Sequence, residues 1–206
     1  MSGENEENEA LQASSDSLRR PIRSDAKRNT DALLAAALAV FSISGVDAPV
    51  REIVETAGVG IGTLYRHFPQ RADLIAAVFR REVDACADAA PALMETLNPA
   101  DALAAWLQRY TDFIAAKRGL APALHSGDPA YATLHGYFQS RLEPVLQKLL
   151  DTAVLAGAVR SDVDANDLLR TVANLCMSAN GTDFSLARRM VDLIVDGLRY
   201  GAHGKA

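Results

Sequence analysis

Apolar residues recur every three or four positions along most of the chain, which is the repeat of one face of an α-helix. The pattern starts after Ser24, stops at Gly45, returns in two short segments at 49–56 and 61–68, and resumes at Gln70. Further stretches follow at about 99–117, 119–125, 129–157, 164–179 and 183–200. No segment keeps the two-residue alternation of a half-buried strand. The sequence therefore predicts an all-α protein of about nine helices.

Two prolines lie where a helix would otherwise continue. Pro91 follows the helix that begins at Gln70, and we expect it to end that helix. Pro144 lies inside the predicted helix 129–157, where we expect a kink because proline removes a backbone hydrogen bond. Residues 126–128 and 158–162 are predicted loops.

The two short helices are joined by a three-residue break, Gly58-Val59-Gly60, and a longer helix precedes them. This arrangement is typical of a helix-turn-helix unit, in which the start of the second helix is free to enter the major groove of DNA. At 100° per residue, Ile61, Leu64 and Phe68 are predicted to face the core. The free face then carries Gly62, Thr63, Arg66 and His67, with Tyr65 at its border.

These residue types suit DNA. Thr63, Tyr65, Arg66 and His67 bring hydrogen-bonding side chains, and Gly62 has no side chain to hold the backbone away from a base edge. Arg51, on the outer face of the preceding helix, carries a guanidinium that matches guanine O6 and N7. Arg71 adds a cation at the start of the next helix, where the helix end already favours an anion.

The distribution of charge supports the same partner. The chain has 206 residues, of which 49% are apolar and 23% charged, and its net charge is −5. Residues 1–18 carry five acidic side chains and no basic one, residues 19–80 have a net charge of +3, and residues 81–206 a net charge of −3. The acidic start predicts a disordered tail. The basic arm that follows, up to Arg23, is either a solvated linker or a contact to phosphates.

The stretch from Leu33 to Phe79, above all AGVGIGTLYRHFPQRADLIAAVF, resembles the DNA-binding domain of the TetR family of bacterial transcriptional regulators. The resemblance implies a tail and arm at 1–23, a helix-turn-helix domain at 24–69, and a helical effector-binding and dimerisation domain at 70–206. It places base or groove contacts on Arg51, Thr63 and Tyr65, with His67 and Arg71 near phosphates. Gly60 stands where the family usually has serine.

The resemblance also implies a homodimer that binds a palindromic operator on double-stranded DNA. The last two helices would form a four-helix interface with those of a second subunit, although their periodicity alone shows only that each has a buried face. The apolar residues of that face are Leu168, Leu169, Val172, Leu175, Met190, Leu193, Ile194 and Leu198.

A ligand pocket is expected among the middle helices, because cavities in helical bundles combine apolar walls with a few polar groups. The candidates are aromatic and imidazole side chains, and for each of them plain core packing is the alternative. They are Trp106, Tyr110, Phe113, His125, His135 and Phe138. We expect an unidentified small-molecule effector that releases a repressor from its operator.

Other classes of protein find little support. The histidines fit no HExxH spacing, Cys86 and Cys176 form no CxxC pair, and a GxGxxG motif fails at Thr63, so no enzyme, cofactor or metal site is predicted. No apolar run approaches the roughly 20 residues needed to span a bilayer, and the acidic start is unlike a secretory signal, so we expect a cytoplasmic protein without a membrane partner. The alternative function is a helical protein-interaction adaptor that does not bind DNA.

Overall fold

The computed structural model describes residues 27–178 and 184–200, and these residues form helices and loops without strands, which confirms the all-α fold. The tail and basic arm predicted at 1–23 lie outside the described residues. The first helix covers residues 27–44. It is followed by α2 (Val50–Ala57), α3 (Ile61–His67) and α4 (Arg71–Ala87).

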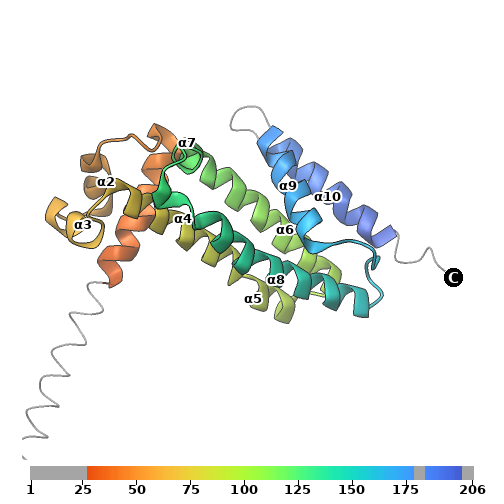
Figure 1. Cartoon of the computed structure of the whole chain (residues 1–206). Coiled ribbons are helices and arrows are strands. Elements are labelled where there is room, and N and C mark those ends of the chain that lie inside the picture. Colours follow the sequence, from red (N-terminus) through yellow and green to blue (C-terminus); the bar gives the residue numbers. More distant parts are fainter. Residues whose placement is uncertain (1–26, 179–183, 201–206) are drawn as a thin grey trace, which may run out of the picture.

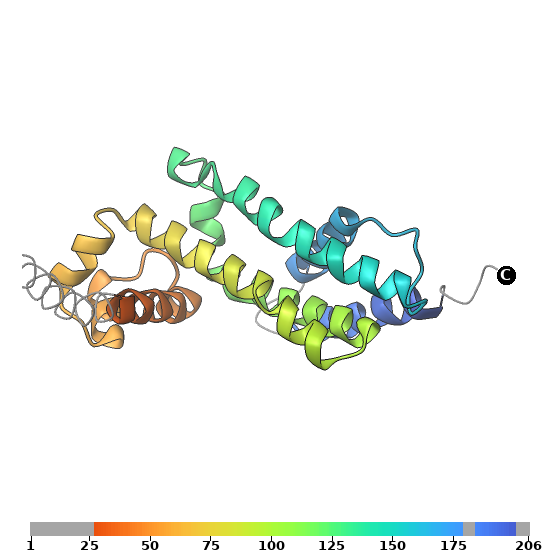
Figure 2. The same cartoon turned by 90° about the horizontal axis from the view of Figure 1, so that it is seen from below.

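The remaining elements form the larger part of the molecule. They are α5 (Ala90–Thr96), α6 (Pro99–Ala116), the 3₁₀ turn η1 (Lys117–Leu120), α7 (Ala121–Leu124), the 3₁₀ turn η2 (Pro129–Tyr131), α8 (Leu134–Leu155), α9 (Ala165–Ser178) and α10 (Ser185–Tyr200). The first three helices form a group at one end of the molecule, and α4 extends from them along the larger group (Figures 1 and 2). Within that group α6 packs against α4, α8, α9 and α10.

The N-terminal group is held together by the apolar faces that the periodicity predicted. The first helix buries Leu33, Ala37 and Phe41, while α2 buries Ile53 and α3 buries Leu64. Removal of such side chains from water is the main force that holds short helices together.

Glycine ends α2 in the left-handed conformation. Gly58 has φ of 68°, which residues with a Cβ rarely adopt, and its N–H donates to the carbonyl of Glu55. The N-terminal end of α4 is fixed by a capping box, in which the N–H of Gln70 donates to Asp73 at 2.9 Å. These two local features fix the end of α2 before α3 and the start of α4 after it.

The position of Pro91 differs from expectation, while Pro144 lies inside a helix as predicted and its kink stays a prediction. The helix from Arg71 ends at Ala87, before Pro91, which instead lies in the first turn of α5, where a missing N–H costs no hydrogen bond. Pro144 lies inside α8, and the helix continues through it. The segment predicted as one helix at 129–157 is divided, since η2 precedes α8 and α8 begins at Leu134.

The apolar face predicted for the dimer interface is largely used inside the chain itself. Leu168, Leu169, Val172 and Leu198 are buried in the core of the protomer, where α9 and α10 pack on α6. The expectation that these four side chains meet a second subunit is therefore wrong. The exposed large apolar residues of α9 and α10 are Met177, Leu186, Leu193 and Tyr200. None of the helices in the described ranges is both long and apolar enough to cross a membrane.

Candidate functional site

The exposed surface of α3 is the first part of the candidate site. Leu64 and Phe68 anchor α3 in the core, with 2% and 8% of their surfaces exposed. Gly62, Tyr65 and Arg66 of the same helix face solvent. Thr63 and His67 are half-buried at the edges of this surface. The N-terminal turn of α3 therefore projects from the N-terminal group (Figure 1).

One residue of α3 contradicts the sequence prediction. Ile61 was expected in the core, but 52% of its surface is exposed. Because Leu64 and Phe68 anchor the C-terminal half of the helix, its first residue lies beyond the core that they contact. The projecting turn consequently offers an apolar side chain beside its polar ones.

His67 connects α3 to the first helix. Its Nδ1 lies 3.5 Å from the hydroxyl oxygen of Thr30, a partner 37 residues earlier in the chain. This contact orients the imidazole across the joint between the two helices. His67 therefore has a structural contact in addition to any contact it makes outside the protein.

Arg51 lies on the outer face of α2 and is paired within its own helix. Its Nε donates to Oε1 of Glu55 at 2.7 Å, and 85% of the Arg51 side chain is exposed. The hydrogen bond and the charge of Glu55 raise the pKa of Arg51. An ion pair so open to water is weak, so the guanidinium is free to exchange Glu55 for another acceptor.

Arg71 has an internal role that sequence reasoning missed. Its guanidinium donates to the carbonyl of Val46 and, at 2.7 Å, to the carbonyl of Ala48. Both carbonyls belong to the loop that leads into α2. Two of the guanidinium nitrogens therefore hold this loop in place, while the contact of Arg71 with phosphate stays a prediction.

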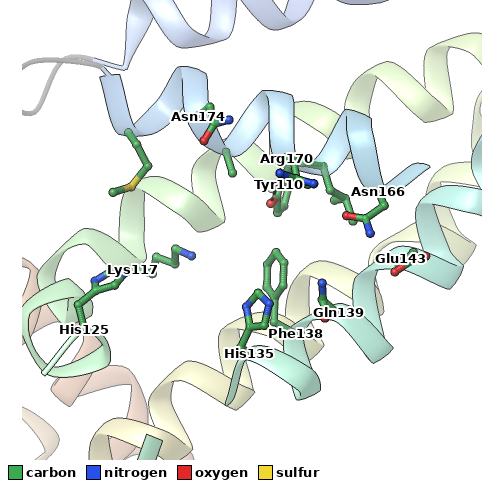
Figure 3. A pocket seen from close by; sticks show the side chains of 13 residues that line it. Tyr110, Lys117, His125, His135, Phe138, Gln139, Glu143, Asn166, Arg170 and Asn174 are labelled. Atoms are coloured by element: carbon green, nitrogen blue, oxygen red, sulfur yellow. Dashed lines mark hydrogen bonds between the residues drawn. The ribbon is translucent and has the colours of Figure 1, made fainter. Parts of the chain in front are cut away.

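A cavity of about 620 Å³ lies between α6, η1, α8 and α9 (Figure 3). Of the six residues proposed for a pocket, Tyr110, His125, His135 and Phe138 line it. The other lining residues are Lys117, Gln139, Glu143, Asn166, Leu169, Arg170, Ala173, Asn174 and Met177.

Trp106 and Phe113 lie behind the wall of this cavity instead of lining it. Trp106 is fully buried and its Nε1 donates to the carbonyl of Cys86 at 3.0 Å. The ring of Trp106 stacks on Tyr110 with 5.8 Å between centroids, and the ring of Phe113 stacks on Phe138 at 6.0 Å. For these two residues core packing, the alternative left open by the sequence, describes their position.

The sequence prediction named aromatic and histidine side chains and missed the other polar residues of the cavity. Helical spacing offered a signal: Gln139 and Glu143 follow His135 by four and eight residues along one helix. On the next helix Asn166, Arg170 and Asn174 repeat the same spacing. Which helices face one another across the cavity depends on the tertiary fold and was not visible in the sequence.

Two family models cover most of the described chain. Residues 33–78 match the model for bacterial regulatory proteins of the tetR family. Residues 98–200 match the model for the C-terminal domain of SbtR-like transcriptional regulators. The first match contains the exposed surface of α3, and the second contains the cavity.

Solved structures extend the likeness over most of the chain. A TetR transcriptional regulator from Streptomyces coelicolor is 42% identical, with a TM-score of 0.72, over 82% of this chain and 98% of that one. A TetR transcription regulatory protein from Mycobacterium vanbaalenii is 34% identical, with a TM-score of 0.67, over 87% of this chain and 99% of that one.

Among curated proteins, an HTH-type transcriptional regulator from Staphylococcus aureus is 38% identical over 64 residues. That match covers 31% of this chain and only 35%, about a third, of the relative. The matches at both ends of the chain and along nearly the whole of two solved structures confirm the resemblance first seen around α3. The chain belongs to the TetR family of bacterial transcriptional regulators.

Proposed function

We propose that the protein is a dimeric repressor that binds a palindromic operator and is released from it by a small-molecule effector. The observation that carries this proposal is the projecting N-terminal turn of α3, whose exposed side chains are backed by a buried Leu64. A short helix held in this way fits the major groove, which is wide enough to admit an α-helix.

Each exposed group of the projecting turn has a role in DNA recognition under this proposal. Gly62 lets the backbone approach the base edges, Thr63 and Tyr65 form hydrogen bonds, and Ile61 contacts a thymine methyl group. Arg66 contacts the DNA backbone, and so does His67 from the end of the helix. The guanidinium of Arg51 leaves its ion pair with Glu55 and donates hydrogen bonds to a guanine base instead. Arg71 keeps the loop before α2 in position.

A second copy of the chain is proposed to cover the outer face of α10. Leu186, Leu193 and Tyr200 are exposed and lie seven residues apart, so they form one stripe along the helix. Met190 and Gly197 lie between them, so that the residues of the stripe alternate by four and three positions, the spacing of two helices that pack side by side. Two subunits joined here would present two α3 helices to half-sites about one helical turn, or a multiple of it, apart.

The effector is proposed to bind in the cavity among α6, η1, α8 and α9. Binding there would change the spacing of the two α3 helices through α4, which runs from Arg71 into the larger group (Figure 2). Because coupling between two sites is reciprocal, operator DNA must weaken effector binding by the same factor that effector weakens operator binding.

Selection of bound duplexes from a random-sequence pool tests the proposal. We expect enrichment of an inverted repeat whose two halves bind two protomers. A protein-interaction adaptor would enrich no duplex, and a monomeric DNA-binding protein would enrich a single half-site without symmetry. Either of these results would overturn the proposed function.

A further inference from the structure

Lys117 is a cation that enters the cavity without an acidic partner. It begins η1, is half-buried, and its ammonium lies 5.4 Å from the ring centroid of Phe138 and 5.7 Å from that of Phe113. Within the described ranges its ammonium makes no hydrogen bond or ion pair, while its backbone N–H donates to the carbonyl of Phe113 at the end of α6. Figure 3 shows its side chain directed toward the middle of the cavity. The two rings stabilise the charge only in part, so the ammonium remains available to an anion.

The charges around the cavity reinforce this preference. Arg170 is a second cation in the lining, and His125 and His135 add imidazole side chains. Glu143 is the only carboxylate of the lining, and Figure 3 places it at the opposite end from Lys117. The end of the cavity that holds Lys117 therefore favours an anion, and the end that holds Glu143 favours a hydrogen-bond donor.

Burial of the charged ammonium of Lys117 costs free energy, and a bound anion would offset this cost. Removal from water lowers the pKa of Lys117, since the charged form loses hydration that the two aromatic rings do not fully replace. A negative group bound beside the ammonium would raise this pKa again. Charge-assisted hydrogen bonds of this kind are shorter and stronger than neutral ones.

The walls of the cavity define the body of the ligand. Phe138 presents a half-buried ring, whose centroid lies 6.1 Å from that of the fully buried Tyr110, and Ala173 and Met177 add apolar surface from α9. His135 and Glu143 are eight residues apart on α8, which corresponds to about 12 Å along a helix. A volume of about 620 Å³ is typical of sites for small organic molecules.

We propose that this cavity binds an organic acid, whose carboxylate contacts Lys117 while its flat apolar body lies against Phe138 and Met177. A hydroxyl group at the far end of the molecule would donate to Glu143. This inference rests on the proposed function only in treating the cavity as the effector site. Binding of the acid itself requires neither DNA nor a second subunit.

The test compares acids with amides of the same shape. Calorimetry on the full chain would measure the Kd of 2-naphthoate and 4-hydroxycinnamate against 2-naphthamide and 4-hydroxycinnamamide. We expect each acid to bind about tenfold more tightly than its amide, since only the acid meets the ammonium. Equal affinities, or no binding of either acid, would overturn the proposal.

Two variants locate the charge that matters. Lys117→Met keeps the apolar stem and removes the ammonium, so we expect it to lose about tenfold in acid affinity and to leave amide affinity unchanged. Lys148→Met removes the same charge from an exposed position of α8 outside the cavity and should alter neither affinity. A Lys117→Met protein that keeps the acid preference contradicts the assignment.

Folding defects do not obscure the outcome. The comparison of acid with amide is made on the unaltered protein, and thermal unfolding checks each variant. Arg170→Gln, at an exposed position of α9, provides a second test and should also reduce the preference for acids. The selection of DNA uses the protein without ligand, and calorimetry uses it without DNA. A protein that does not prefer acids and a protein that does not bind DNA are therefore separate results.

Discussion

Gly119 in η1 lies directly against the carbonyl of Phe41 at the C-terminal end of the first helix. A Cβ built at Gly119 would lie 2.3 Å from that oxygen and 2.7 Å from its carbon, closer than real Cβ contacts. The same oxygen accepts a hydrogen bond from the N–H of Gly45 at 3.0 Å. Lys117, at the edge of the cavity, precedes Gly119 by two residues. Besides α4, a backbone contact that needs a glycine therefore connects the edge of the cavity to the first helix.

Gly119→Ala should force η1 away from the first helix, because the opposing atoms belong to the backbone and cannot rotate aside. We expect the free energy of unfolding to fall by roughly 1–3 kcal/mol, which is the usual cost of adding an atom to a packed contact. Chemical denaturation measures this change. Gly136→Ala, in α8 with open space around its Cβ position, should be neutral or stabilising. A Gly119→Ala protein as stable as the unaltered one would contradict the contact.

Arg71→Ala should leave the carbonyls of Val46 and Ala48 without their donor and loosen the loop before α2. We expect weaker binding to every duplex with an unchanged dependence on salt concentration, because no phosphate contact is lost. Titrations at several salt concentrations measure this slope. Arg66→Ala, on the exposed face of α3, should instead reduce the slope by about 1. A similar reduction in the Arg71→Ala protein would show that Arg71 contacts phosphate.

Glu55→Gln should strengthen DNA binding, because it releases Arg51 from its ion pair and removes a negative charge from α2. The measurement is the Kd for the selected duplex. Glu95→Gln changes the same charge on α5 and should have no effect. Arg51→Ala should reduce the preference at one base pair of each half-site by about tenfold. If Arg51→Ala lowers the affinity for all duplex sequences equally, Arg51 does not recognise a base.

Leu193→Glu should separate the two protomers, since it places a charge at the centre of the exposed stripe on α10. Burial of an unpaired charge in an apolar interface costs far more than the contact it replaces. Sedimentation equilibrium should show a monomer, and affinity for the selected duplex should fall by more than about tenfold. Ile43→Glu, at a position of the first helix that is 88% exposed against 60% for Leu193, should remain dimeric. A dimeric Leu193→Glu protein would place the interface elsewhere.

Local features of this fold could be predicted from the sequence, while features that depend on partners far along the chain could not. Gly58 and the apolar face of the first helix are local signals, and both appear where expected. Leu168 and Leu198 were assigned to a partner because periodicity reveals a buried face without revealing what covers it. The internal hydrogen bonds of Arg71 were missed for a similar reason, since their acceptors lie 23 and 25 residues earlier in the chain.

Directed cleavage of DNA tests the central claim, that α3 enters the major groove of each half-site. Both native cysteines are buried. Burial raises the pKa of the Cys86 thiol to about 12, and it also raises the pKa of the Cys176 thiol. Neither thiol should therefore react in the folded protein. Gly60→Cys, with open space around the Cβ position at the start of α3, then provides one reactive thiol for an iron chelate.

The selected duplex bound to the labelled protein should be cut at two clusters of positions, one in each half of the inverted repeat and symmetric about its centre. A label at Glu95→Cys on α5 should give no such clusters. Paired cuts of this kind would place an α3 helix in each half-site. Cuts spread evenly along the duplex, or confined to one end of it, would contradict the claim.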